Sequence, residues 1–163
     1  SALVLDPDII IMDEPTTALD LLVQREVIEQ IMNLRDDFGF AVIFTTHDLA
    51  LLLEISDSIA VMQAGRVVEY GPAEDIHAEP GHPYTRALLS SIPSIGTGKK
   101  KMTRILTGEI PSPINPPMGC TFHPRCPHKI KECSEIVPPL IQKGAEHYKA
   151  CIVNLDTNLK ETL

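Results

Sequence analysis

The sequence predicts an α/β fold, in which parallel strands alternate with helices. Two short apolar runs, residues 9–12 and 41–44, have the length and β-branched content of buried strands, and the first suits a strand buried on both faces of a parallel sheet. Between them, residues 21–38 carry apolar side chains at the spacing of one helix face: Val23, Val27, Ile31, Leu34 and Phe38. A strand, a helix and a second strand in this order form a right-handed crossover unit, whose two strands lie parallel in one sheet.

The boundaries of these elements are marked by particular residues. Pro15 stops the first strand, because proline has no backbone N–H to pair. Asp20 is placed to cap the helix, and Gly39 to end it. Asp48 is expected to cap a second helix that runs to about residue 55. The sequence therefore predicts two helices and two strands before residue 56.

Shorter elements are predicted after this unit. Residues 58–63 and 66–70 are β-branched runs on either side of Ala64-Gly65, which is typical of a β-hairpin. Proline and glycine become frequent after Gly71, so only short helical pieces are expected at residues 72–77 and 84–91.

Polar side chains follow both predicted parallel strands. Asp13 and Glu14 come directly after the first, and His47 follows the second. Ligands of open α/β sheets sit at the carboxyl ends of the strands, so we expect His47 to lie near Glu14. An acidic pair at such an edge can hold magnesium through water and orient a second water for attack on a phosphate.

The strings IIIMDEPTTALD (residues 9–20) and TTHD (residues 45–48) resemble the Walker B segment, the D-loop and the switch histidine of ATP-binding-cassette (ABC) ATPases. This resemblance implies ATP and Mg²⁺ as cofactors, held between two such subunits that face head to tail. It also implies four residue roles. Asp13 would help to hold magnesium, Glu14 would be the general base, His47 would contact the γ-phosphate and the attacking water, and Asp20 would reach across the dimer interface.

The sequence has no phosphate-binding loop of the form G-x-x-x-x-G-K-[ST]. The nearest segment is residues 96–100. If Gly98 and Lys99 are aligned with the glycine and lysine of the motif, Pro93 stands where the first glycine should be and Lys100 replaces the Ser/Thr. The LSGGQ-type motif of ABC ATPases is also absent. We therefore interpret the chain as the C-terminal part of a P-loop NTPase core, which we expect to be inactive alone.

The segment PGHPYTRALLSSIP (residues 80–93) and the proline-rich residues 108–140 resemble the ATP-binding subunits of dipeptide and oligopeptide importers. The resemblance implies a subunit that energises peptide uptake at the cytoplasmic face of the membrane. Its partners would be transmembrane permease subunits, a second ATPase subunit and, indirectly, a peptide-binding protein. The same resemblance divides the chain into the C-terminal half of an ATPase domain (1–71), a helical connector (72–94) and a C-terminal extension (95–163).

All four cysteines, Cys120, Cys126, Cys133 and Cys151, fall in this extension. Four thiolates can hold a [4Fe–4S] cluster or Zn²⁺, but their spacing matches neither zinc knuckles nor ferredoxins. Resemblance to the peptide importers implies a [4Fe–4S] cluster, with zinc as the alternative and free buried thiols as a third. The expectation is a small, loop-rich extension clipped by a metal centre.

Two rival functions are a non-transport ABC ATPase and a stand-alone metal-binding or redox module. The formal net charge of −8 argues against a nucleic-acid partner. A local basic run, Lys99 to Lys101 with Arg104, is interpreted as a solvated loop. No stretch approaches the roughly 20 apolar residues of a membrane-spanning helix.

Overall fold

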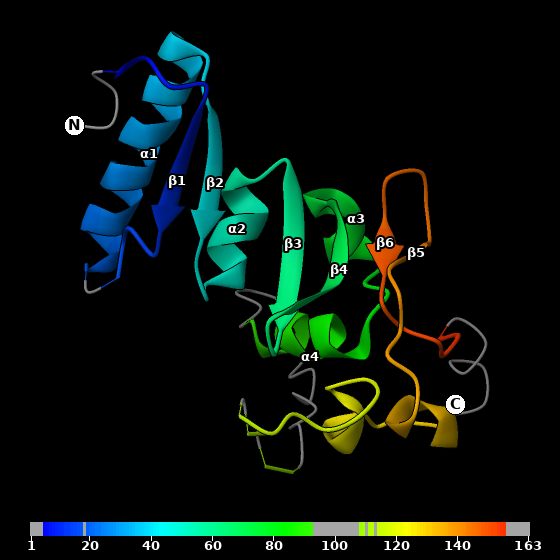
Figure 1. Cartoon of the computed structure of the whole chain (residues 1–163). Coiled ribbons are helices and arrows are strands. Elements are labelled where there is room, and N and C mark those ends of the chain that lie inside the picture. The colour runs from blue at the N-terminus through cyan, green and yellow to red at the C-terminus, as the bar shows by residue number, and fades with distance from the viewer. Residues whose placement is uncertain (1–4, 18, 93–107, 110, 113, 156–163) are drawn as a thin grey trace, which may run out of the picture. The chain divides into compact units, whose positions relative to one another are not determined.

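The computed structural model describes residues 5–17, 19–92, 108–109, 111–112 and 114–155 (Figure 1). It divides into two compact units, residues 1–48 and 49–163. The domain boundaries expected after residues 71 and 94 stay predictions. Residue 94 itself, the segment 96–100 that fails as a phosphate-binding loop, and the basic run at 99–104 lie outside the described residues.

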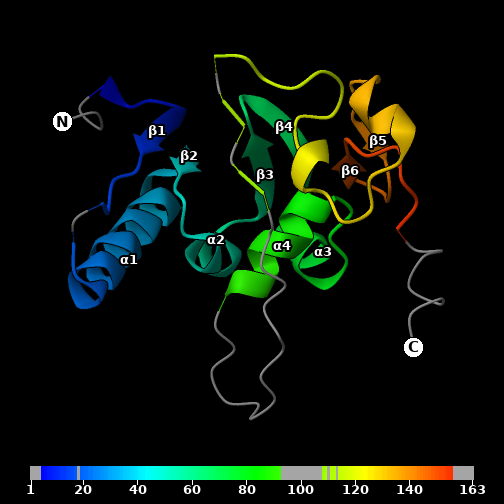
Figure 2. The same ribbon diagram turned by 90° about the horizontal axis from the view of Figure 1, so that it is seen from below.

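The first unit is the predicted strand–helix–strand crossover. Strands β1 (Ile9–Asp13) and β2 (Ala41–Thr45) pair in parallel from Ile9↔Ala41 to Asp13↔Thr45. Helix α1 (Leu21–Phe38) connects them and lies beside both strands (Figure 1, Figure 2). Asp20 caps the helix, since its carboxylate accepts the N–H groups of Leu22 and Val23 at 3.0 Å each. Gly39 ends it with φ of 74°.

The expectation that β1 is buried on both faces is wrong for this chain. Ile9 and Ile11 are 57% and 69% exposed, and Ile43 on β2 is 52% exposed. Their sheet has two strands within the described residues, and α1 covers one face of it. The alternate residues Ile10 and Met12 are accordingly half-buried. A parallel sheet normally has both faces covered, so this unit leaves an apolar face open.

The second unit is built around a β-hairpin. Helix α2 (Leu49–Ile55) precedes strands β3 (Ser58–Gln63) and β4 (Arg66–Pro72), which pair antiparallel. Ala64 and Gly65 form the turn, both with positive φ, as two-residue hairpin loops require. Helices α3 (Ala73–Ala78) and α4 (Pro83–Ser91) follow. One buried hydrophobic cluster of this unit contains Ile59, Val61, Val68, Ala73 and Ile76, and a second contains Cys133, Cys151, Val153 and Leu155.

Within its described residues, the extension consists of short pieces. Two 3₁₀ turns, η2 (His123–Arg125) and η3 (Lys131–Ser134), precede strands β5 (Ile141–Gln142) and β6 (Tyr148–Lys149). Strand β6 pairs antiparallel with β4, which gives a sheet of order β3-β4-β6-β5 (Figure 1). These two strands were not predicted. Through them the end of the extension joins the same sheet as the hairpin.

None of the helices in the described part of the chain is long and apolar enough to cross a membrane.

Candidate functional site

Asp13, Glu14 and His47 meet at the carboxyl ends of β1 and β2. His47 Nδ1 lies 3.3 Å from Glu14 Oε1. The backbone N–H of Glu14 donates to the carbonyl of Thr45 at 3.0 Å, which joins the ends of the two strands. The predicted proximity of His47 and Glu14 is therefore confirmed. Both side chains face solvent, with His47 79% and Glu14 46% exposed.

Two threonine hydroxyls hold the two carboxylates. Thr17 Oγ1 donates to Glu14 Oε2 at 2.8 Å, and Thr45 Oγ1 donates to Asp13 Oδ1. The hydrogen bond from Thr17, and after it the contact with His47, lowers the pKa of Glu14 below its ordinary value. Glu14 is therefore an ionised acceptor at neutral pH, as a general base must be.

These two contacts were not predicted from the sequence. One signal was available for Thr17, because a Ser or Thr three residues after an acidic side chain in a turn can bond back to it. Thr45 offered no such signal, since its contact with Asp13 spans 32 positions and exists only once the strands pair. The catalytic roles expected of Asp13, Glu14 and His47 stay predictions.

Glu14 has an unusual backbone. Its φ of 44° is in the left-handed region, which is disfavoured for any residue with a Cβ atom. The strand ends here, and the Thr17 N–H closes a turn on the Glu14 carbonyl at 3.1 Å. Strained residues of this kind concentrate at functional sites, where surrounding contacts hold them. The turn directs the Glu14 side chain toward His47. Asp20, which follows the turn, caps α1 within this unit.

The four cysteines line one small cavity, about 10 Å³ in volume, together with Phe122 and His123. All four are free thiols, and Cys133 and Cys151 are buried. The N–H of Cys120 donates to the carbonyl of Cys133 at 2.9 Å. Gly119 makes this approach possible, because a Cβ atom there would lie 2.4 Å from the Cys133 oxygen. The backbone thus brings the four thiols of a long segment to one place.

Burial of these thiols raises the pKa of Cys126 to about 11 and also raises the pKa values of Cys120 and Cys151. Neighbouring thiols in the group add to the shifts. Four sulfurs around one cavity match a Cys₄ ligand set by residue type. Their arrangement does not match, because no three His, Cys, Asp or Glu side chains in the described residues are positioned to hold a metal ion. The metal clip therefore stays a prediction.

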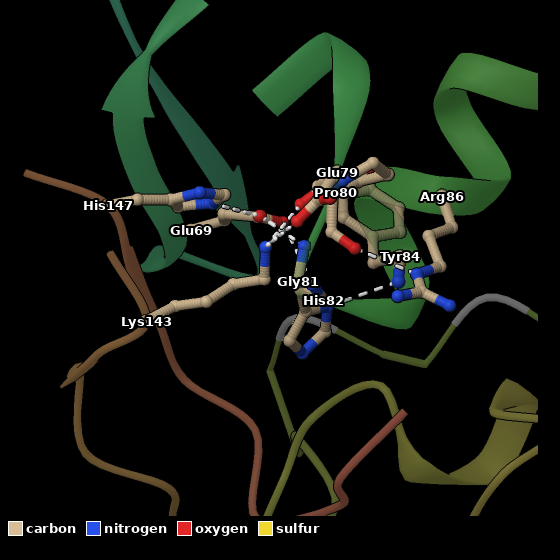
Figure 3. A network of polar contacts seen from close by, with 9 residues as sticks. All are labelled: Glu69, Glu79, Pro80, Gly81, His82, Tyr84, Arg86, Lys143 and His147. Atoms are coloured by element: carbon tan, nitrogen blue, oxygen red, sulfur yellow. Dashed lines mark hydrogen bonds and ion pairs between the residues drawn. The ribbon is translucent and has the colours of Figure 1, made fainter. Parts of the chain in front are cut away.

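A buried polar network lies elsewhere in the second unit, and sequence analysis missed it entirely (Figure 3). Glu69 on β4 is fully buried. Its carboxylate accepts the backbone N–H groups of Gly81 and of His82, the latter at 2.9 Å. His147 Nε2 lies 2.7 Å from Glu69 Oε1, and Figure 3 shows the two side chains pointing toward one another. One carboxylate thus connects β4, the start of α4 and the last hairpin of the extension.

The segment His82-Pro83-Tyr84 is explained by this network. His82 Nδ1 accepts the N–H of Tyr84 at 3.1 Å and caps α4, while Pro83 occupies the first turn. The rings of His82 and Tyr84 pack on Phe122, with centroids 5.9 and 5.4 Å away. Burial lowers the pKa of His82 to about 4, so the ring is neutral at pH 7. The segment therefore anchors the cysteine-bearing loop to the helical part of its unit.

Comparison with known proteins gives a consistent result. Residues 68–133 match the family described as oligopeptide/dipeptide transporter, C-terminal region. Over 93% of its length, the chain is 46% identical to a putative peptide import ATP-binding protein of Brucella ovis. It is also similar to the dipeptide transport ATP-binding proteins DppF of Haemophilus influenzae (44% identical over 91% of the chain) and of Escherichia coli (40% over 96%).

The match spans 48%, 46% and 47% of these three relatives, so the chain covers about half the length of the curated relatives it matches. The resemblance that the motifs indicated is confirmed.

Proposed function

We propose that this chain is part of an ATP-binding subunit that hydrolyses ATP to drive the uptake of di- or oligopeptides. One observation carries the proposal. Asp13, Glu14 and His47 lie together at the carboxyl ends of β1 and β2, in a chain similar to peptide import ATP-binding proteins. The names of these relatives favour peptide transport over a non-transport ABC ATPase. In the complete assembly the partners would be permease subunits, a second ATPase subunit and, indirectly, a peptide-binding protein, at the cytoplasmic face of the membrane.

Asp20 and the three residues at the carboxyl ends of β1 and β2 each have a distinct role in this proposal. Asp13 helps to hold Mg²⁺, and Glu14 accepts a proton from the water that attacks the γ-phosphate. His47 contacts that phosphate, and Asp20 reaches the second subunit. Phosphoryl transfer depends mostly on positioning and charge, so a base held beside the histidine, 3.3 Å away, is the arrangement that the reaction needs.

The test is a chimera in which this chain replaces the residues it matches in DppF of Escherichia coli. Glu14→Gln keeps the shape of the side chain but removes the base, so ATP hydrolysis should fall by orders of magnitude while ATP binding survives. Glu29→Gln, an exposed substitution on α1, is the matched control and should leave both unchanged. Near-normal turnover in Glu14→Gln, or equal loss of binding and turnover, would show that Glu14 is not the base.

We also propose that Cys120, Cys126, Cys133 and Cys151 hold a [4Fe–4S] cluster, with Zn²⁺ as the alternative. Support comes from the cavity that all four side chains line, and the thiols must shift from their positions in this structure to become ligands. Ligation requires thiolates, so binding must overcome the raised pKa values and would release protons. The bound centre would add folding free energy to a lobe with little apolar material.

Metal analysis of protein purified without oxygen tests this second proposal. A brown protein with about four irons per chain is expected, and Cys133→Ser should abolish the colour. One zinc and no iron would select the alternative, and free thiols without metal would reject both. Reduction titration of an iron-containing sample would separate a structural centre from a stand-alone redox module.

A further inference from the structure

We infer that Thr17 is a positioning residue for ATP hydrolysis, whose hydroxyl fixes one oxygen of Glu14 so that the other faces the attacking water. This inference rests on the proposed function. It assigns a role to Thr17, a residue that has none in the roles proposed for Asp13, Glu14 and His47.

The contacts of Glu14 carry the inference. Thr17 Oγ1 donates to Oε2 at 2.8 Å, while His47 Nδ1 lies 3.3 Å from Oε1, so the two oxygens are held separately. Thr17 is itself fixed, because its backbone N–H donates to the Glu14 carbonyl at 3.1 Å. The same turn therefore sets both the donor and the acceptor, and all of these contacts lie within the first unit.

A fixed oxygen matters because Glu14 is otherwise free to move. Its side chain is 46% exposed and has several rotatable bonds, so an untethered carboxylate would sample many orientations. A general base must lie within hydrogen-bond reach of the proton it takes. The shorter contact to Thr17 leaves Oε1 as the oxygen that can exchange its contact with His47 for one with water.

Thr17→Val tests the inference in the DppF chimera, because valine has nearly the shape of threonine and no hydroxyl. We expect kcat to fall by about 10- to 100-fold, the scale of a misplaced catalytic group, with the KM for ATP changed by less than about twofold. Thr17→Ser retains the hydroxyl and should restore most of the rate. A fall in Thr17→Ser as large as in Thr17→Val would overturn the inference.

A double-mutant cycle shows whether Thr17 acts through Glu14. If it does, Thr17→Val combined with Glu14→Gln should be no slower than Glu14→Gln alone, because the group that Thr17 positions no longer acts as a base. Multiplication of the two losses would instead assign Thr17 a separate, structural effect.

A measurement on the 163-residue chain tests whether Thr17 holds the Glu14 side chain without relying on ATP turnover. Three-bond NMR couplings of the Glu14 side chain should report one dominant rotamer in the wild type and in Thr17→Ser, and averaged rotamers in Thr17→Val. If the wild-type chimera fails to hydrolyse ATP, the proposed function fails, while these couplings still decide whether Thr17 holds Glu14. Identical couplings in all three proteins would reject the inference.

Discussion

At the scale of single residues, the site depends on side chains that hold one another rather than on isolated groups. Asp13, Glu14 and His47 could be named from the sequence because each follows a recognisable strand. Thr45 could not, because its hydroxyl reaches Asp13 only after two strands pair in one register. The local sequence therefore indicates the candidate site residues, but it does not indicate the side chains that hold them.

His82 gives a pH dependence that can be measured. Its pKa is about 4 in the folded chain and 6.5 for an ordinary histidine, because burial disfavours the charged ring. Between these values the unfolded chain binds a proton that the folded chain excludes. The contribution of His82 is therefore fully present above pH 6.5 and is lost as the pH falls toward 4, by up to about 3 kcal/mol.

The measurement is the free energy of urea unfolding of the chain from pH 7 to pH 4.5. His82→Asn keeps an acceptor that can cap α4 but does not titrate, so its stability should fall less steeply with decreasing pH. Comparison of the slopes removes any constant loss from the missing ring contacts with Phe122. Parallel slopes in the two proteins would contradict the buried, neutral state of His82.

At the scale of elements, hydrophobic periodicity predicted α1, and cap, turn and proline signals predicted α2, α3, α4 and the β3–β4 hairpin, each to within one or two residues. It did not predict β5 and β6, which have two residues each and no pattern of their own. They exist because β6 pairs with β4, for example Tyr70 with Tyr148, far apart in the sequence. The burial of Glu69 was not predicted for a related reason, because its partners Gly81, His82 and His147 lie outside its strand.

Glu69 is expected to control the stability of the second unit. Glu69→Gln leaves a buried amide whose one oxygen cannot serve Gly81, His82 and His147 together. Leaving a buried donor without an acceptor typically costs about 1–3 kcal/mol, so the midpoint of urea unfolding should fall markedly. Glu74→Gln, an exposed position on α3, is the matched control and should change stability by less than about 0.5 kcal/mol.

The location of that loss is as informative as its size. Hydrogen exchange in Glu69→Gln should accelerate first at Gly81, His82 and the β4–β6 pairing, which the carboxylate joins. Exchange in β1 and β2 should be unchanged, since those strands form a separate compact unit. Equal destabilisation by Glu69→Gln and Glu74→Gln would show that the network adds nothing to stability.

At the scale of the whole molecule, the division into units depends on contacts that the sequence does not display. Proline and glycine become frequent after Gly71, where the periodic pattern stops. The two compact units separate after Asp48, because α2 packs with the hairpin and α3 in one core. The open face of Ile9, Ile11 and Ile43 likewise follows from the number of strands in the sheet, which local periodicity cannot count.

The last prediction concerns the 163-residue chain by itself. We expect it to bind ATP no more tightly than millimolar and to hydrolyse none above background. Most phosphate contacts in P-loop ATPases come from backbone N–H groups and a lysine of one glycine-rich loop, and this sequence has no such loop. In the proposed function Glu14 would supply a base and His47 a phosphate contact, but neither can position an unbound nucleotide. Calorimetric titration of MgATP provides the measurement, with complete DppF of Escherichia coli as the positive control. Micromolar affinity of the chain for MgATP would mean that the carboxyl ends of β1 and β2 bind nucleotide without a phosphate-binding loop.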